Sequence, residues 1–385
     1  MRRLSSLFSS FWTTKKESST TEPSDGHLDI SFEPVYTNNN NNNSQGAILR
    51  SNKNLQLSPQ EQELVEFSEK IVDLVFVCDN TGSMSGEINV AKDTIQTIIT
   101  SLHDHFKSDL RFSAVSYRDH SDDYAVKEFP FTRNVQVAKS YIQEMFAEGG
   151  GDYPEALVSA LKVVSEMPFN KKGKKIVIWI ADAPPHGMGA SGDSYPEGCK
   201  DENNQVIDWI KLGDYLMEKG CVFYTLICER SQNDQQLTLF MDYLATKTHG
   251  KCLLLTNANK VPNLIINGCI EDDEMDKLIA EKIKEIGEER AKQMKEEELA
   301  EQLQKLTENH KVQQVQTYEV ISSNTKQLLE CDSLSKVDRN LYCNASNSVK
   351  KSGVSRTDET QFNYGEVLCE APSYSQVYKA CKRWK

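Results

Sequence analysis

Short apolar runs alternate with amphipathic stretches between residues 62 and 270. Continuous apolar strands that alternate with helices are typical of a parallel sheet covered on both faces. The pattern predicts an α/β fold: a doubly wound, mostly parallel six-stranded sheet with helices on both faces. The predicted strands are VDLVFVC (72–78), LRFSAVSY (110–117), VKEFPF (126–131), KIVIWIA (175–181), CVFYTLIC (221–228) and KCLLLT (251–256), with helices near 86–106, 134–147, 152–167, 204–219 and 234–248. Pro130 cannot donate to a central ladder, so VKEFPF is predicted at an edge of the sheet.

The segments that flank this domain, 62–270, have other patterns. Residues 1–61 are rich in Ser, Thr and Asn and are predicted to be a disordered tail, because they cannot bury enough apolar surface to offset chain entropy. Within the tail, residues 4–12 have apolar side chains at helical spacing, which leaves a membrane contact or a targeting role open. Residues 271–316 are predicted to form a charged helix that either docks one narrow face on the domain or self-associates through 272–312 as a short coiled coil. Residues 317–385 are polar and irregular, and are interpreted as partly disordered or as a small subdomain.

Composition narrows the classes of function. The net charge of −13 argues against nucleic acid as a partner, because phosphate binding needs clustered Lys and Arg. No apolar run approaches the roughly 18 residues that a membrane helix requires. The ten cysteines include no CxxC pair, which favours a cytoplasmic protein with reduced thiols.

Oxygen-bearing side chains follow the predicted strands. Asp79, Thr81 and Ser83 alternate directly after the first strand, Asp182 follows the strand 175–181, and Asp152 lies in the glycine-rich loop EGGGDYPEAL. Ligands of doubly wound sheets bind beyond the carboxyl ends of the strands. Oxygen ligands without His or Cys suit a hard divalent cation, so the sequence predicts a site for Mg²⁺, or for Mn²⁺ or Ca²⁺.

The residues DNTGS at 79–83 resemble the D-x-S/T-x-S signature of the von Willebrand factor A (VWA) domain. The resemblance covers about residues 70–256, and it is nearest to the VWA branch found beside alpha-type kinases. That branch is indicated by the blocks SYRDH (116–120), GGGDYPEA (149–156), IADAPPHG (180–187) and DSYPEG (193–198).

The resemblance implies a Rossmann-like VWA fold with a metal-ion-dependent adhesion site. Thr81 and Ser83 would coordinate through hydroxyls, and Asp79 and Asp182 partly through bound waters. In adhesion members a loop threonine completes the set, and an acidic side chain of the partner protein fills the open position. This chain has GGGD in that loop, so Asp152 is the candidate in the threonine's place.

Three aspartates would bring a charge of −3 against a +2 ion. A net negative site should attract an acidic partner side chain less readily, so the metal is expected mainly to order three loops into a binding surface. The sequence thus predicts a non-enzymatic, divalent-metal-dependent module that binds another protein.

Two other functions stay open. The chain could be a regulatory or degenerate relative of the VWA-containing alpha-type kinases. A Mg²⁺-dependent phosphatase of the haloacid-dehalogenase type would need an acid/base aspartate two positions after Asp79, where this chain has Thr81. Among the remaining polar residues, Arg118 is expected to pair with acids at the rim, Asp119 to fix a turn and His186 to hydrogen-bond within a loop.

Overall fold

A computed structural model of the chain describes residues 32–35, 48–51, 71–106, 109–310, 312–315, 318–351, 367–370, 372 and 374–384. The amphipathic segment 4–12 and the asparagine tract at 38–43 lie outside the described residues. None of the helices in the described part is both long and apolar enough to cross a membrane.

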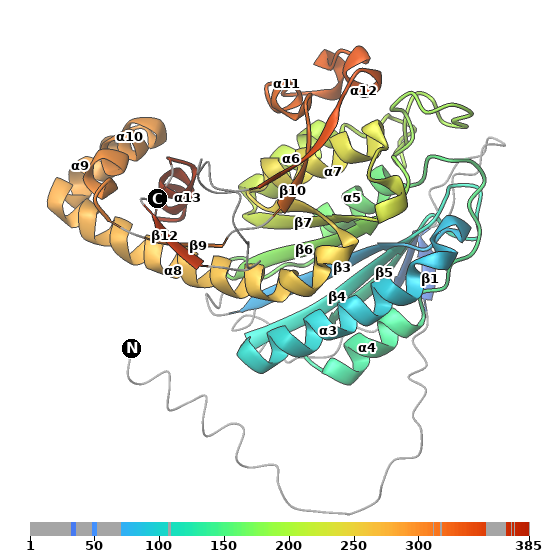
Figure 1. The fold of residues 1–385 in the computed structure, drawn as a ribbon, viewed down its shortest axis with the longest axis horizontal. Helices are drawn as coiled ribbons and strands as arrows, with labels where there is room; N and C mark the ends of the chain where they lie inside the picture. The colour runs from blue at the N-terminus through green and yellow to red at the C-terminus, as the bar shows by residue number, and fades with distance from the viewer. Residues whose placement is uncertain are drawn as a thin grey trace, which may run out of the picture. The chain divides into compact units, whose positions relative to one another are not determined.

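The main sheet has eight strands in the order β1-β2-β5-β4-β3-β6-β7-β8 (Figure 1). Neighbouring strands are parallel except in the pairs β1–β2 and β4–β5, so the predicted mostly parallel α/β sheet is confirmed. The strands are β1 (Phe32–Val35), β2 (Ile48–Ser51), β3 (Val72–Asp79), β4 (Leu110–Tyr117), β5 (Val126–Thr132), β6 (Lys174–Ala181), β7 (Cys221–Ile227) and β8 (Lys251–Leu254).

Two of these strands correct the sequence-based prediction. β1 and β2 lie in the segment 1–61, which was predicted to be disordered, and they add two strands to the six expected. Because β2 pairs with β5, β5 is not at the edge of the sheet. The pairing with β2 covers only Val126–Glu128, and the register with β4 shifts between Phe112 and Ala114, opposite Pro130. The missing N–H of Pro130 therefore falls at a bulge, where no regular ladder needs it.

Five helices match the predicted helical stretches and cover the two faces of the sheet (Figure 1). Figure 1 shows α3 and α4 on one face, and α5, α6 and α7 on the other. Asn134, Asp208 and Asp234 cap α4, α6 and α7 by accepting hydrogen bonds from the first-turn N–H groups. The bounds are α3 (Ile88–Phe106), α4 (Val135–Gln143), α5 (Leu157–Glu166), α6 (Trp209–Glu218) and α7 (Gln235–Lys247), with 3₁₀ turns η1 (Gly82–Gly86), η3 (Glu229–Ser231), η4 (Leu255–Lys260) and η5 (Leu334–Lys336).

The predicted charged helix at 271–316 is three helices: α8 (Val261–Ile286), α9 (Glu288–Gln293) and α10 (Glu296–Thr307). α8 follows η4 directly and runs through the expected boundary at 270–271. It ends at Gly287, whose φ of 96° is unfavourable for other residues. Leu299 and Leu303 of α10 are buried against α8 and against α13 (Tyr374–Trp384). Leu299 and Leu303 are therefore covered by α13 of the same chain, and self-association of 272–312 through these two leucines would require that contact to open.

The described part of residues 317–385 contains ordered elements that dock on the VWA-like sheet domain. β10 (Tyr318–Ser322) pairs with β11 (Asn347–Lys351), and β9 (Val312–Val315) pairs with β12 (Val367–Glu370). Between β10 and β11 lie α11 (Thr325–Leu329) and α12 (Asn340–Cys343). Asp242 of α7 accepts hydrogen bonds from Ser322 N (2.9 Å) and from the Thr325 hydroxyl, so this part is tied to the domain by a buried carboxylate.

Candidate functional site

Asp79, Thr81 and Ser83 come together at the carboxyl end of β3, as predicted; we call these three residues with Asp182 the strand-end site. Asp79 Oδ1 accepts hydrogen bonds from Thr81 N (2.9 Å) and Thr81 Oγ1 (2.7 Å), which fixes the turn into η1. Thr81 Oγ1 lies 3.0 Å from Ser83 Oγ. Asp79 and Thr81 are buried and Ser83 is exposed, so a row of oxygens leads from the interior to the surface.

Asp182 follows β6, the neighbour of β3, and is held by Arg230 from η3. Asp182 Oδ2 forms an ion pair with Arg230 Nη2, and Ser231 Oγ donates to the backbone oxygen of Asp182 (2.5 Å). Burial raises the pKa of Asp79 to about 6, and the Thr81 hydrogen bonds and the charge of Arg230 act in the opposite direction. The guanidinium of Arg230 therefore acts electrostatically on both carboxylates of the strand-end site.

Glu155 also reaches the strand-end site, although its side chain was not predicted there. Its side chain is buried, and a Cβ added to Gly150 would lie 3.2 Å from Glu155 Oε1 and 3.4 Å from Thr81 Cβ. Burial and the charges of Asp79 and Asp119 raise the pKa of Glu155 to about 11. The only signal in the sequence is its place in the block GGGDYPEA, three residues after Asp152.

The glycine loop, which contains Gly149, Gly150 and Gly151, packs directly against the strand-end site. Gly82 N donates to Gly149 O (3.1 Å), and a Cβ on Gly82 would lie only 2.9 Å from that oxygen. Gly149 and Gly150 have φ of 78° and 86°, a region that favours glycine. The close approach of this loop therefore depends on its glycines.

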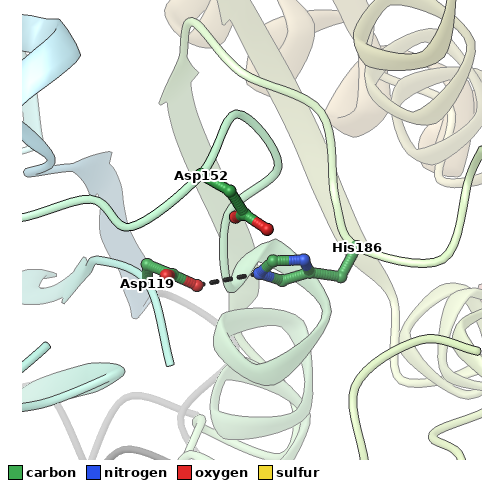
Figure 2. Close-up of side chains that lie close together, drawn as sticks. All are labelled: Asp119, Asp152 and His186. Carbon is green, nitrogen blue, oxygen red and sulfur yellow. Dashed lines mark hydrogen bonds and ion pairs between the residues drawn. The ribbon is translucent and has the colours of Figure 1, made fainter. Parts of the chain in front are cut away.

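Asp152 belongs to a second group, with Asp119 and His186 (Figure 2). One ligand atom from each of these residues lies within 4.8 Å of the other two, and no other such group of three His, Cys, Asp or Glu residues occurs in the described part of the chain. Asp152 Oδ2 accepts from Ser194 N (2.6 Å), while its Oδ1 is buried without a hydrogen-bond partner. Asp152 is therefore placed in this second group, and not with Asp79 and Thr81.

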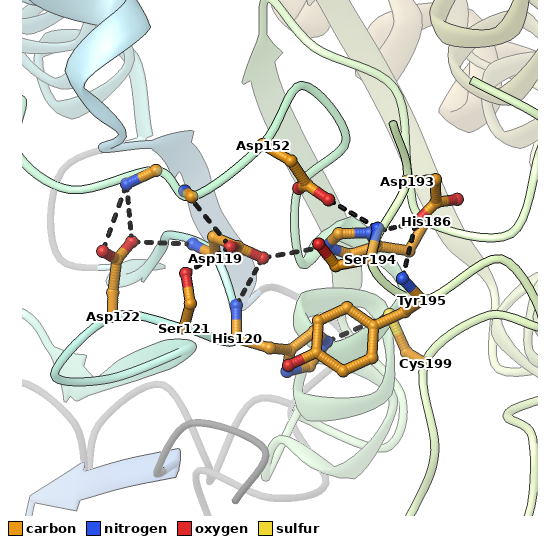
Figure 3. A network of polar contacts seen from close by, with 12 residues as sticks. Asp119, His120, Ser121, Asp122, Asp152, His186, Asp193, Ser194, Tyr195 and Cys199 are labelled. Carbon is orange, nitrogen blue, oxygen red and sulfur yellow. Dashed lines mark hydrogen bonds and ion pairs between the residues drawn. The ribbon is translucent and has the colours of Figure 1, made fainter. Parts of the chain in front are cut away.

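His186 connects two aspartates whose side chains are nearly inaccessible to solvent (Figure 3). Its Nε2 lies 2.8 Å from Asp119 Oδ1 and its Nδ1 lies 2.7 Å from Asp193 Oδ1. Burial lowers the pKa of His186, but the bonds to Asp119 and Asp193 outweigh it and the pKa is raised. For Asp119, burial raises the pKa, but the bonds to His186 and Ser121 outweigh it and the pKa is lowered.

The expected structural roles of the remaining polar residues are observed. Arg118 forms an ion pair with Glu148 (3.2 Å). Asp119 fixes its own turn, since it accepts from His120 N (2.6 Å) and Ser121 Oγ (2.6 Å), and it also accepts from Gly151 N (3.2 Å). His186 does bond within the rim loops, although its contact with Asp119 was not predicted.

The chemistry of the strand-end site fits a hard divalent cation. Asp79 Oδ2 and Asp182 Oδ1 are buried and have no hydrogen-bond partner. Buried carboxylate oxygens without partners are costly and are expected to face a cation. Two adjacent hydroxyls and these carboxylates form an all-oxygen donor set, which is the type that Mg²⁺, Mn²⁺ and Ca²⁺ prefer.

The fold and the strand-end site define the class: an α/β domain with a doubly wound sheet and its polar site at the carboxyl ends of the strands. Residues 73–187 match the family model for the von Willebrand factor A domain. The chain therefore carries a VWA domain, as the sequence predicted.

Two relatives and one solved structure share parts of the chain. An ariadne-like RING finger protein of Acanthamoeba polyphaga mimivirus is 28% identical over 195 residues, which cover 50% of this chain and 19% of that protein. An alpha-protein kinase of Dictyostelium discoideum, vwkA, is 32% identical over 155 residues, which cover 39% of this chain and 24% of the kinase. The pilus adhesin SpaC from Lactobacillus rhamnosus GG aligns with 51% of this chain and 30% of its own, at 14% identity and a TM-score of 0.39. The chain thus spans less than a quarter of the length of either of these relatives.

Proposed function

We propose that the VWA domain is a non-catalytic module that binds another protein through a surface that depends on a divalent cation. The main support is the position of two hydroxyls beside the buried carboxylate of Asp79. Thr81 Oγ1 donates to Asp79 Oδ1 (2.7 Å) and lies 3.0 Å from Ser83 Oγ. Asp79, Thr81, Ser83 and Asp182 would hold the ion. Mg²⁺ suits this all-oxygen set, and Mn²⁺ or Ca²⁺ could replace it.

The charges around the strand-end site support an acidic side chain as the partner's contact. Asp79 and Asp182 carry at most −2, and burial raises the pKa of Glu155 to about 11, which favours its neutral form. A divalent cation and Arg230 together bring +3, so the site would be net positive. The net negative charge expected from the sequence counted Asp152 and did not count Arg230. A bound cation would supply an open coordination position of positive potential, which a Glu or Asp of the partner can fill.

Affinity capture tests this function most directly. The full chain and Asp79→Ala are each used as bait, with Mg²⁺ and with EDTA. We expect proteins that are retained by the wild type in Mg²⁺ and lost both in EDTA and with Asp79→Ala. Asp332→Ala, which removes an exposed ion pair with Lys336, serves as the control bait and should behave as the wild type. A set of partners that neither treatment changes would refute the proposal.

Replacing Arg230 by glutamine should tighten Mg²⁺ binding about tenfold at low salt. The guanidinium forms the ion pair with Asp182 and lies 3.6 Å from Glu87 Oε2, so its charge opposes a second cation. Isothermal calorimetry with Mg²⁺ measures the effect. Arg339→Gln, which removes an exposed guanidinium paired with Glu197, is the matched control and should not change the affinity. Weaker binding in Arg230→Gln would mean that Arg230 holds Asp182 in place for the ion.

A regulatory relative of a kinase is the second candidate, and the observation that favours it is the 32% identity to the alpha-protein kinase of Dictyostelium discoideum. Such a relative would also act by binding, so it differs from the first proposal in its partner and not in its site. Phosphatase chemistry is disfavoured, because Thr81 occupies the position of the required acid and donates its hydroxyl to Asp79. No hydrolysis of a generic phosphate ester is expected in Mg²⁺.

A further inference from the structure

Three loops bring Asp119, Asp152 and His186 together at the rim of the sheet (Figure 2). We propose that these three side chains form a second metal site, separate from the strand-end site, for a borderline transition-metal ion such as Zn²⁺. The proposal rests on three independent features: the spacing of the ligand atoms, a buried carboxylate oxygen without a partner, and the orientation of the histidine ring.

The spacing of the ligand atoms suits one ion. Metal bonds of about 2.0–2.2 Å place ligand atoms about 3.3–3.6 Å apart in a tetrahedral site, and place neighbouring ones about 3 Å apart in an octahedral site. His186 Nε2 and Asp119 Oδ1 lie 2.8 Å apart, and all three ligand atoms lie within 4.8 Å of one another. Asp152 is the least buried of the three residues.

Asp152 has an unused acceptor at this centre. Its Oδ2 is fixed by Ser194 N (2.6 Å), whereas its Oδ1 is inaccessible to solvent and has no hydrogen-bond partner. A buried carboxylate oxygen without a partner loses its hydration without compensation. A cation bound by Asp119 and His186 would supply that compensation.

Asp193 orients the histidine ring as in known metal sites (Figure 3). His186 is buried, and its Nδ1 lies 2.7 Å from Asp193 Oδ1. Asp193 is itself held by Tyr195 N (2.8 Å) and Gly187 N (2.7 Å). When Nδ1–H donates to Asp193, the lone pair of Nε2 faces the carboxylate of Asp119. Two acceptors 2.8 Å apart repel unless they share a proton or bind the same cation, and a metal bound to Nε2 would complete the carboxylate–histidine–metal chain that is usual in proteins.

The donor types separate this site from the strand-end site. Imidazole nitrogen with carboxylates favours Zn²⁺, Mn²⁺, Fe²⁺ or Co²⁺, whereas the strand-end site offers only oxygen. The two sites share a loop: Gly151 N donates to Asp119 (3.2 Å), and Gly149 O accepts from Gly82 N (3.1 Å). An ion at the second site would therefore hold the glycine loop in place beside the strand-end site.

Zinc titration of the full chain tests the proposal. All proteins carry Cys343→Ser, because Cys343 is an exposed thiol close to Gly189. They are stripped with a chelator, dialysed and titrated with Zn²⁺ by calorimetry in excess Mg²⁺. We expect one equivalent of Zn²⁺ to bind with the Cys343→Ser parent and with Asp79→Ala. Asp152→Asn and His186→Gln should each lower the affinity at least about tenfold. Co²⁺ in place of Zn²⁺ should show a visible absorption band that His186→Gln alters.

Each other outcome overturns the proposal. Zinc affinity that survives both Asp152→Asn and His186→Gln places the ion elsewhere. Zinc binding that Asp79→Ala removes and Asp152→Asn leaves intact assigns it to the strand-end site. A parent protein that binds no Zn²⁺ means that a proton, not a metal, bridges His186 and Asp119. Thermal unfolding shows whether each variant is folded. If His186→Gln does not fold, the zinc affinity of Asp152→Asn alone decides the outcome.

Discussion

Replacing Asp79 by alanine is expected to weaken Mg²⁺ binding on the order of a hundredfold or more, because affinity follows the number of charged ligands. Asp79 is buried at the end of β3, and its Oδ2 has no partner in the protein. Its Oδ1 also accepts from both the N–H and the hydroxyl of Thr81, at 2.9 and 2.7 Å. The substitution therefore removes a charge and frees the hydroxyl that would bind beside it. Isothermal calorimetry with Mg²⁺, repeated with Mn²⁺ by electron paramagnetic resonance, measures the loss.

Asp79→Asn is the matched control for this experiment. The amide keeps an acceptor for Thr81 but removes the charge, so its Mg²⁺ affinity should lie between those of the wild type and Asp79→Ala. Without metal, Asp79→Ala should be less stable than Asp79→Asn, because only the alanine variant leaves the buried Thr81 N–H without its acceptor. Unchanged Mg²⁺ binding in Asp79→Ala would place the cation outside the strand-end site.

The periodicity of the sequence predicted the central strands because each is a long apolar run. Six predicted strands and five predicted helices are present. β1 and β2 were missed because FEPV and ILRS have four residues each and lie in a polar segment with no alternation to mark them. Their pairing with β5 is a long-range contact, and local patterns do not encode it.

The candidate site was predictable where its residues are close in sequence. Asp79, Thr81 and Ser83 lie within five positions, so their convergence follows from one tight turn. Glu155 comes near Thr81 only through the folded path of the loop, where Gly150 lies close to both side chains, and no local pattern marks that approach. Arg230 was missed because it comes from η3 and is not a metal ligand.

The second group, Asp119, Asp152 and His186, could not be predicted as a group from the sequence. Asp119, Asp152 and His186 lie in three separate blocks of the sequence, and each block indicated the resemblance to the VWA branch. Their meeting depends on the order of the strands, because the loops after β4 and β6 both reach the glycine loop before α5. Each residue could be given a local role from the sequence, but their common centre required the fold.

Asp73→Ala is expected to lower the free energy of unfolding by ~3–5 kcal/mol, because breaking a buried ion pair leaves its partner uncompensated. Asp73 lies at the start of β3, directly opposite Arg111 of β4. Its two oxygens accept from Arg111 Nε and Nη2, both at 2.6 Å, and Asn170 N donates to Oδ2 at 2.5 Å. The carboxylate is fully buried and the guanidinium nearly so. Removing Asp73 therefore leaves a cation and a backbone N–H without this acceptor, and chemical denaturation measures the cost.

Two further variants decide whether the pair or the packing is responsible for that loss. The double variant Asp73→Leu with Arg111→Met replaces both charges by apolar side chains, and it should regain most of the stability, because no charge is then left buried. Asp332→Ala removes an exposed ion pair with Lys336 and should leave the unfolding midpoint unchanged, because solvent screens exposed pairs. If Asp73→Ala were as stable as Asp332→Ala, the bidentate pair would not anchor the start of β3. If the double variant were no more stable than Asp73→Ala, the loss would come from packing around β3 and β4 and not from the uncompensated guanidinium.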